Sequence, residues 1–306
     1  MLSYTAVIVT FNRKKAVRNA LLRQFKQTVS AKRIIVVDNH STDGTKEYIS
    51  DILNDHKDTV RYLRMDENLG GSGGFYYGMK AALEEHTDLI GISDDDASYD
   101  EDYFEKIINC AESHPNDMAF CGSIYINGKL DVTAAKMLVN DKTLKFVPSK
   151  KEDYSQKSFY IDDWPFVGPV FRRELIKKIG LPRKDFFIWY DDSEYALRMH
   201  QNGYRYRLVS DAKIQIYQLD EVRFALWKQY YGFRNELYCL DKYSSGIHKV
   251  IHRQYMIWKK YASVFLKPSN KGQRREAFVA YRKAVVDSRN NNLGKTVKPG
   301  EDFKNK

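Results

Sequence analysis

Strand-like and helix-like segments alternate through the first 125 residues, and no other feature of the sequence restricts the fold as strongly. Short runs rich in β-branched residues predict buried strands, and segments with apolar residues at helical spacing lie between them. This βαβαβαβ order predicts an α/β fold, a mostly parallel sheet with helices on both faces. The expected strands are 6–10, 33–38, 60–65, 89–93 and 118–125, and the expected helices are 13–27, 44–53, 70–85 and 100–113.

Polar residues of functional interest gather at the carboxyl ends of the expected strands. Parallel sheets bind their ligands outside these ends, so we expect one ligand site along this edge. The residues are Thr10, Phe11, Asn12 and Arg13 after the first strand, Asp38 and Asn39 at the second, Asn68 to Gly74 after the third, and Asp94 to Asp96 after the fourth.

Asp94, Asp95 and Asp96 follow the buried run 89–93 directly. Three adjacent carboxylates repel one another, and a divalent cation that prefers oxygen, Mg²⁺ or Mn²⁺, removes this cost and can bridge to a diphosphate. Alternate residues of an extended segment point the same way, so Asp94 and Asp96 could share the metal. A solvated acidic loop is the alternative, and the position after a buried strand favours the metal.

Four glycines between 70 and 74 open the third expected helix. Glycine lets a ligand approach the backbone closely, and a helix N-terminus favours an anion. Tight packing of the helix start on the sheet explains the same glycines equally well. The motif is not a dinucleotide fingerprint, because Tyr76 stands where G-x-G-x-x-G requires a glycine.

An aromatic run at 186–190 leads into Asp191 and Asp192, and a helix follows. A carboxylate with apolar neighbours can have a raised pKa and serve as a general base. At a helix start, the same residues can serve as an N-cap or as favourable charge in the first turn, and for this motif taken alone that common role is favoured. Trp164 could form an aromatic wall for a sugar ring, although core packing is the more common explanation of a single tryptophan.

The character of the chain changes near residue 217, where further helices are expected. Residues 247–289 contain eleven Lys and Arg against two acids, so they hold +9 of the net charge of +10. Such a basic region suggests an anionic partner, lipid headgroups or nucleic acid, and no nucleic-acid recognition motif accompanies it. We expect an α/β domain at 1–217, a basic, membrane-proximal helical region at 218–290 and a disordered tail at 291–306.

Cysteine usage and hydropathy bear on the compartment. Cys110, Cys121 and Cys239 are far apart and lack CxxC spacing, which argues against a disulfide framework and for a reducing compartment. No apolar run approaches the roughly 20 residues that span a bilayer, and the first apolar run is too short for a secretory signal. We therefore expect a cytoplasmic protein, peripheral at the inner face of the cell membrane.

Taken together, these motifs resemble the inverting glycosyltransferases of family 2, which have the GT-A fold. The resemblance runs through VIVTFNR (7–13), VVDNHSTDGT (36–45), the three aspartates and YDDSEYALR (190–198). The sequences ENLGGSGGF (67–75) and SDDDA (93–97) look like those of the galactofuranosyltransferase branch, which makes cell-wall, capsule or O-antigen polysaccharide. Rhamnosyltransferases share much of this pattern.

The resemblance implies substrates and roles. The donor would be a UDP-sugar, most simply UDP-galactofuranose, with dTDP-rhamnose as the alternative, and the acceptor a hydroxyl of a lipid-linked glycan. By resemblance, the catalytic base is Asp192, the acceptor contacts Trp164 and Asp191, and the metal (Mn²⁺ or Mg²⁺) contacts Asp94 and Asp96. The resemblance also implies that the nucleotide sugar contacts Thr10, Phe11, Asn12, Arg13, Asp38, Asn68, Gly70, Gly71, Asp94 and Asp95.

The sequence departs from the family pattern at two points. No histidine occurs at 213–218, where the family usually places a metal ligand, so Gln215, Gln218 or water would complete the metal site. The galactofuranosyl branch tends to carry paired tryptophans where this chain has Trp164 and Pro165. A nucleotidyltransferase would instead show a basic Gly-rich loop after the first strand, and a non-catalytic carbohydrate-binding protein would not need to retain both acidic clusters.

Overall fold

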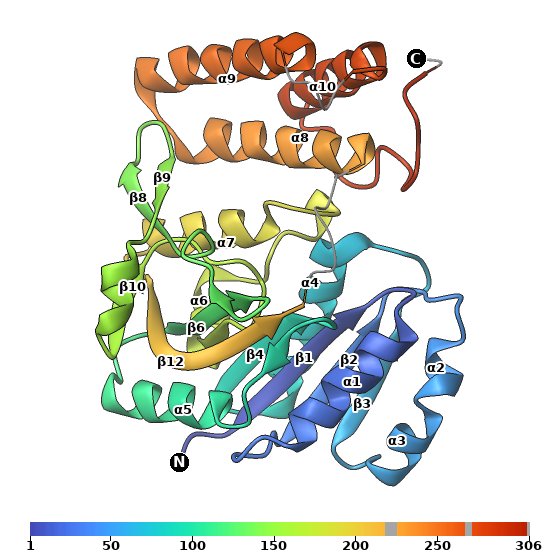
Figure 1. Ribbon diagram of the computed structural model, residues 1–306, viewed down its shortest axis with the longest axis vertical. Coiled ribbons are helices and arrows are strands. Elements are labelled where there is room, and N and C mark those ends of the chain that lie inside the picture. Colours follow the sequence, from blue (N-terminus) through green and yellow to red (C-terminus); the bar gives the residue numbers. More distant parts are fainter. Residues whose placement is uncertain (218–224, 267–270, 305–306) are drawn as a thin grey trace.

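The computed structural model of the protein describes residues 1–217, 225–266 and 271–304. Its central sheet has the strand order β10-β12-β6-β11-β4-β1-β2-β3, with β5 paired to β12 and β7 paired to β6 (Figure 1). The strands are β1 (Tyr4–Thr10), β2 (Arg33–Asp38), β3 (Val60–Arg64), β4 (Leu89–Asp94), β5 (Ser98–Tyr99), β6 (Ala119–Ile126), β7 (Lys129–Leu130), β10 (Ser158–Ile161), β11 (Val170–Arg172) and β12 (Tyr206–Ile216). A separate hairpin consists of β8 (Lys136–Asn140) and β9 (Lys145–Pro148).

The first half of the sheet confirms the expected parallel arrangement. Strands β1, β2, β3 and β4 are all parallel, and β1 lies between β2 and β4. The chain therefore winds from β1 outward to β3 and then crosses back to the other side of β1. In open α/β sheets, ligands bind at the carboxyl ends of the two strands beside such a reversal, here β1 and β4. The second half is mixed, because β11 runs antiparallel to both β4 and β6.

Helices cover both faces of the sheet, as expected. Tyr4 of β1 points to one face, where its hydroxyl accepts from Gln24 of α1 and its ring stacks on Phe104 of α5. Val7 and Val9 point to the opposite face and contact α4. The helices of this part are α1 (Lys14–Phe25), α2 (Thr45–Tyr48), α3 (Ser50–Asp55), α4 (Gly70–Ala82), α5 (Tyr103–Ser113), α6 (Arg173–Ile179) and α7 (Asp191–Gln201).

One expected helix is broken in the structure. The segment 44–53 forms α2 and α3, which are separated by Ile49. The backbone of Ile49 leaves the helical region, with φ −110° and ψ 12°, and its side chain is fully buried. Burial of this single side chain therefore coincides with the break, which helical spacing alone did not predict.

Three long helices form a second layer at the end of the molecule away from α1 and α5 (Figure 1). They are α8 (Leu226–Tyr243), α9 (Gly246–Leu266) and α10 (Arg274–Arg289), and they match the expected helical region. Together they enclose a separate hydrophobic core, to which Phe187 from the α/β part also belongs. The expected boundary at 217/218 falls at the edge of residues 218–224, which lie outside the described residues.

The expected disorder at 291–306 was wrong for the residues that the structure describes. Val297 and Phe303 are buried in the core of the helical layer. The hydroxyl of Tyr231 donates to the carbonyl of Val297 at 2.6 Å, and Arg234 donates to the carbonyl of Gly294 at 2.9 Å. The segment is mostly polar, which led to the expectation of disorder, but these two apolar residues pack it against α8.

None of the described helices combines the length and the apolar composition that crossing a bilayer requires.

Candidate active site

The carboxyl ends of β1 and β4 carry the first acidic cluster. The hydroxyl of Thr10, at the end of β1, donates to Asp95 at 2.6 Å. The guanidinium of Arg13 lies 2.9 Å from a carboxylate oxygen of Asp95 and 3.0 Å from one of Asp96. Asp95 is almost completely buried, whereas Asp96 is exposed. Thr10, Arg13 and the three aspartates thus form one constellation, as the strand order predicted.

Asp94 connects this cluster to the second one. Its pKa is raised well above the ordinary value, first by burial and then by the negative charges of Asp96, Asp95 and Asp191. The influence of Asp191 means that the two acidic segments, almost one hundred residues apart in sequence, lie close together in space. The buried negative charge at this point exceeds what Arg13 compensates.

This arrangement fits a metal that is held jointly with a substrate. Among the described residues, no cluster of three or more Asp, Glu, His or Cys side chains is placed to hold a metal alone. Mg²⁺ characteristically uses only one or two carboxylates and takes its remaining ligands from water and substrate phosphates. Asp94 and Asp96 could supply those two carboxylates, and the negative charges of Asp95, Asp96 and Asp191 around Asp94 would favour a cation there.

Of the two glutamines considered as metal ligands in place of the histidine, one lies in a described part of the chain. Gln215 of β12 pairs with Ser98 of β5, which begins two residues after Asp96. Gln215 therefore lies on the strand next to the acidic turn. Gln218 lies outside the described residues.

The loop before α7 holds a strained conformation. Phe187, Trp189 and Tyr190 have φ values of 68°, 65° and 67°, in the left-handed region that residues other than glycine rarely adopt. Each such residue costs about 1–3 kcal/mol and persists only where surrounding structure enforces it. Asp191 and Asp192 follow immediately as the first residues of α7, so the strained loop leads directly into the two carboxylates.

Helix α8 enforces this loop through two buried polar side chains. The amide nitrogen of Asn235 lies 3.1 Å from the carbonyl oxygens of Phe186 and Ile188 and 2.8 Å from that of Trp189. Arg234 adds a hydrogen bond to the Phe186 carbonyl at 3.0 Å. Both side chains are completely buried. The sequence analysis missed them, because nothing local distinguishes an Arg-Asn pair inside a helix.

The start of α4 packs against the same loop. The amide of Ser72 donates to the carbonyl of Phe187 at 3.2 Å. Gly70 has a φ of +72°, and a side chain there would overlap the Phe187 carbonyl. A side chain at Gly71, in contrast, would meet no atom within 4 Å. The glycine motif therefore serves tight packing at Gly70 and leaves open space at Gly71.

Asp191 and Asp192 occupy different environments. Burial and then the charge of Asp192 raise the pKa of Asp191, while the Ser72 side chain beside it acts in the opposite direction. The pKa of Asp192 is raised first by burial and then by the charge of Asp163, and Lys136 opposes this rise. A carboxylate with a raised pKa is a stronger proton acceptor, as a general base requires.

Lys136 and Asp163 form an ion pair of 2.7 Å beside Asp192, and the sequence analysis did not anticipate it. Burial opposes the charge of Lys136, yet Asp163 and Asp192 together raise its pKa. The pair comes from the hairpin strand β8 and from the loop after β10, and the two residues also bridge through their backbones. Only the tertiary fold brings these two segments to α7.

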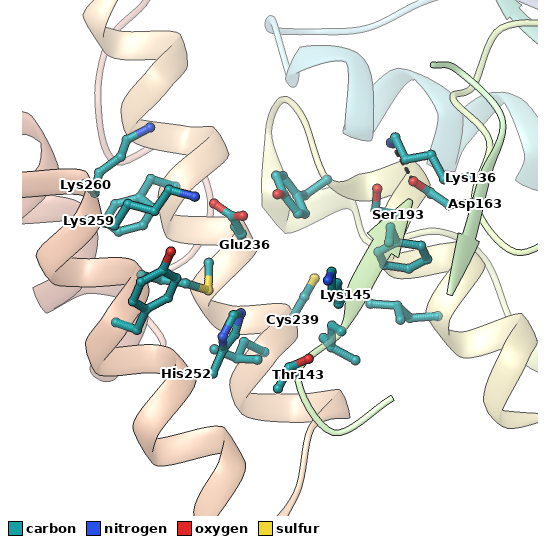
Figure 2. A pocket seen from close by; sticks show the side chains of 18 of the residues that line it. Lys136, Thr143, Lys145, Asp163, Ser193, Glu236, Cys239, His252, Lys259 and Lys260 are labelled. Atoms are coloured by element: carbon teal, nitrogen blue, oxygen red, sulfur yellow. Dashed lines mark hydrogen bonds and ion pairs between the residues drawn. The ribbon is translucent and has the colours of Figure 1, made fainter. Parts of the chain in front are cut away.

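A cavity of about 590 Å³ opens next to this ion pair (Figure 2). Ser193, Lys136 and Asp163 form the wall on the side of the α/β part. Residues of α8 and α9 form the opposite wall, among them Glu236, His252, Lys259 and Lys260, and Lys145 reaches in from the β8–β9 hairpin. The cavity thus joins the neighbourhood of Asp192 to the helical layer.

Two expected contact residues are engaged elsewhere. Trp164 has no exposed surface, and its indole nitrogen donates to the Val167 carbonyl at 3.0 Å, so this ring cannot form an acceptor wall. Core packing, the alternative weighed for it, is what the structure shows. Asp38 is also fully buried, and its carboxylate accepts from Tyr62, from Arg64 and from the amide of Ser41, so it does not face a nucleobase here.

The remaining expected residues line the strand ends. Phe11 is exposed at the end of β1. Asn12 has a φ of 52°, and its side-chain oxygen accepts from the amide of Thr42 at 2.7 Å. Asn68 accepts from the amide of Gly70 at 2.8 Å, and Lys295 donates to its carbonyl at 3.1 Å. These side chains therefore order the loops around the strand ends.

Curated proteins with similar sequences are glycosyltransferases. The chain is 27% identical over 204 residues to galactofuranosyltransferase GlfT1 of Mycolicibacterium smegmatis, an alignment that covers 65% of each protein. It is 25% identical to GlfT1 of Mycobacterium tuberculosis over 83% of this chain and 86% of that protein. It is 23% identical to the dTDP-rhamnosyl transferase RfbF of Shigella flexneri over 68% of this chain and 67% of RfbF.

Solved structures support the fold. The crystal structure of GalNAc-T7 with UDP, GalNAc and Mn²⁺ matches 93% of this chain and 55% of its own with a TM-score of 0.68 at 12% identity. Residues 1–349 of S. aureus TarS in complex with UDP match 93% of this chain and 81% of their own with a TM-score of 0.58 at 16% identity. These likenesses confirm the expected GT-A architecture. The family model for glycosyl transferase family 2 matches residues 5–180, more than half of the chain, and the protein therefore belongs to this family of glycosyltransferases.

Proposed function

We propose that the protein transfers galactofuranose from UDP-galactofuranose to a hydroxyl group of a lipid-linked glycan and inverts the anomeric configuration. One observation supports this most directly: Asp191 contributes to the raised pKa of Asp94, so the cluster suited to a nucleotide diphosphate adjoins the carboxylates suited to an acceptor. The likeness to the two GlfT1 proteins favours galactofuranose as the sugar.

The donor is proposed to lie along the ends of β1 and β4. The open space at Gly71 and the exposed ring of Phe11 leave room for it, and Arg13 offers a positive charge to the diphosphate. When bound, Mn²⁺ or Mg²⁺ held by Asp94 and Asp96 would supply further positive charge to the leaving diphosphate. Asp38 and Trp164 are left out of this assignment, because both are buried and engaged internally.

Asp192 is proposed as the general base. The acceptor oxygen forms a bond to the anomeric carbon of the donor while Asp192 takes its proton, and the bond from that carbon to the diphosphate oxygen breaks, leaving its electrons on UDP. One displacement of this kind inverts the anomeric centre. Lys136 and Asp163 would hold the Asp192 carboxylate in a fixed electrostatic environment, since both influence its pKa.

The acceptor is proposed to enter through the cavity between α7, the β8–β9 hairpin and the helical layer. Its wall next to Asp192 carries Ser193, and its outer part carries Lys145, Lys259 and Lys260, which suit an anionic group on the acceptor. A glycan on a lipid diphosphate has such a group. The basic residues at 247–289 would then keep the enzyme at the inner face of an anionic cell membrane.

The donor identity is tested by incubating the protein with Mn²⁺ and a panel of UDP-, dTDP- and GDP-sugars and measuring which nucleoside diphosphate is released. We expect turnover with UDP-galactofuranose. Turnover restricted to dTDP-rhamnose would instead support the rhamnosyltransferase alternative, which the likeness to RfbF favours. Binding of no nucleotide sugar at all would contradict the proposal.

A further inference from the structure

The outer surface of α9 carries a row of exposed apolar side chains. Its members are separated by one, three, four or seven residues, which places them on one side of a helix of 3.6 residues per turn. Trp258 is the largest, and 70% of its surface is exposed. We call this set the α9 apolar row: Ile247, Val250, Ile251, Tyr255, Trp258, Phe265 and Leu266.

Only a narrow side of α9 is used for packing within the protein. Arg253, Ile257 and Val264 are its buried residues, and they face the rest of the helical layer. An ordinary surface helix buries its apolar stripe and exposes its polar residues. Helix α9 instead exposes most of its large apolar side chains, so these have another purpose than the core.

The charges of α9 identify the partner. The helix has four basic residues and no Asp or Glu; Arg253 is buried, whereas Lys259 is exposed next to Trp258 at the border of the row. The surrounding segment 247–289 has a net charge of +9. An exposed apolar row on a basic helical segment is typical of helices that lie in the interface of an anionic bilayer. A second copy of the chain docked on the same row would bring two strongly positive surfaces together.

We propose that α9 lies in the plane of an anionic membrane and inserts its apolar row into the boundary between headgroups and acyl chains. The helix is not apolar enough to cross the bilayer, which agrees with a position in the interface. Trp258 and Tyr255 suit this depth, because aromatic rings with a polar edge favour the membrane interface.

The placement also explains how a lipid-linked acceptor would reach the base, and this step rests on the proposed function. Tyr255 belongs to the apolar row and also lines the cavity. Lys259 and Lys260 of the same helix line the cavity as well. Ser193 and Lys136 lie on the opposite wall (Figure 2). With α9 embedded, the cavity would open at the level of the headgroups, and an acceptor would not need to leave the membrane.

The test is binding of the full chain to vesicles of phosphatidylcholine with and without phosphatidylglycerol. We expect binding to the anionic vesicles that persists in part at high salt, and a blue shift of tryptophan emission that Trp258→Tyr abolishes. The double variant Ile251→Asn/Phe265→Asn should bind about tenfold less tightly or weaker, because it removes two apolar side chains from the inserted row; tenfold corresponds to about 1.4 kcal/mol.

The matched control is Leu22→Asn/Val139→Asn, which replaces two exposed apolar residues outside the helical layer and should bind as the wild type does. Equal vesicle binding by the Ile251/Phe265 variant and the wild type would overturn the proposal. The proposal would also be overturned if the wild type did not bind vesicles and light scattering showed a dimer that the Ile251/Phe265 variant dissociates. Donor hydrolysis measured without membranes should be unchanged in both variants. If the proposed glycosyltransfer is wrong, the hydrolysis assay shows no turnover, whereas the vesicle assay still tests the membrane proposal.

Discussion

The side-chain amide of Asn235 lies 2.8 Å from the carbonyl oxygen of Trp189, two residues before Asp191. This contact fastens the helical layer to the loop that sets the position of both carboxylates. The helical layer is anchored again at Glu194 of α7, which is completely buried and interacts with Lys242 and Tyr243 of α8. The basic C-terminal region is therefore part of the framework of the proposed active site as well as a surface.

Removing the amide of Asn235 should impair catalysis more than substrate binding. We expect Asn235→Ala to lower kcat by about 10- to 100-fold, since a displacement near 1 Å in a catalytic group has effects of this size. The KM for the donor should change less than kcat, because Asn235 contacts the loop that leads to Asp191 and makes no hydrogen bond to Thr10, Arg13 or Gly71. Steady-state kinetics with both substrates measure the split, and circular dichroism checks the fold.

The control for this variant is Asn19→Ala, at an exposed position of α1. It should leave kcat unchanged. A folded Asn235→Ala enzyme with the kcat of the wild type would show that the loop keeps its conformation without α8.

Asp192→Asn tests the base directly. The amide is nearly isosteric and cannot accept the proton, so kcat should fall by about 10²–10⁴-fold while donor affinity is retained. Calorimetric titration with the donor and a discontinuous transfer assay measure the two quantities. Asp211→Asn, at an exposed position of β12, is the control. More than about a tenth of wild-type turnover in Asp192→Asn would refute the role.

Part of the candidate site could be predicted from the order of strands and helices in the sequence. The rest depends on contacts between segments that are distant in the sequence. The segments that contain Thr10 and Asp95 were expected at one edge of the sheet because parallel strands bring their carboxyl ends together, and the hydrogen bond between these two residues agrees with that expectation. Lys136 and Asp163 could not be predicted, since a hairpin and a loop without periodic signals place them beside Asp192. Trp164 was misassigned because an aromatic residue looks the same in a sequence whether it faces a ligand or the core.

Metal dependence should appear in nucleotide binding. If Asp94 and Asp96 hold the cation, Mn²⁺ should tighten the binding of UDP to the wild-type protein, and chelation should reverse the effect and abolish turnover. In Asp96→Asn the tightening by Mn²⁺ should be lost or strongly reduced, because one of two carboxylate ligands is gone. Asp66→Asn, an exposed aspartate outside the site, should behave as the wild type does. Full activity after exhaustive chelation would exclude a required metal.

The buried Asp191 should destabilise the metal-free fold at neutral and alkaline pH. Its folded-state pKa is raised above the ordinary 3.8, chiefly by burial and by Asp192, so the folded protein holds this proton more tightly than the unfolded chain. The stability that this proton contributes is complete below the unfolded pKa and is lost as pH rises through the folded pKa. Asp191→Asn should therefore raise Tm at alkaline pH, by an amount that shrinks toward acid pH. Thermal unfolding in the presence of a chelator measures this, and a gain in Tm independent of pH would contradict the electrostatic cause.

Two glycines of α4 should respond oppositely to alanine. A Cβ at Gly78 would lie within 3.0 Å of Val7 and Val37, so Gly78→Ala should lower the free energy of unfolding by about 1–3 kcal/mol. At Gly71 a Cβ meets nothing within 4 Å, and the higher helix propensity of alanine should leave the fold unchanged or stabilise it by about 1 kcal/mol at most. The added methyl group would instead enter the space proposed for the nucleotide sugar and raise the KM of the donor. Urea denaturation and donor kinetics on the two variants separate these effects, and a Gly71→Ala enzyme with wild-type donor KM would remove Gly71 from the donor site.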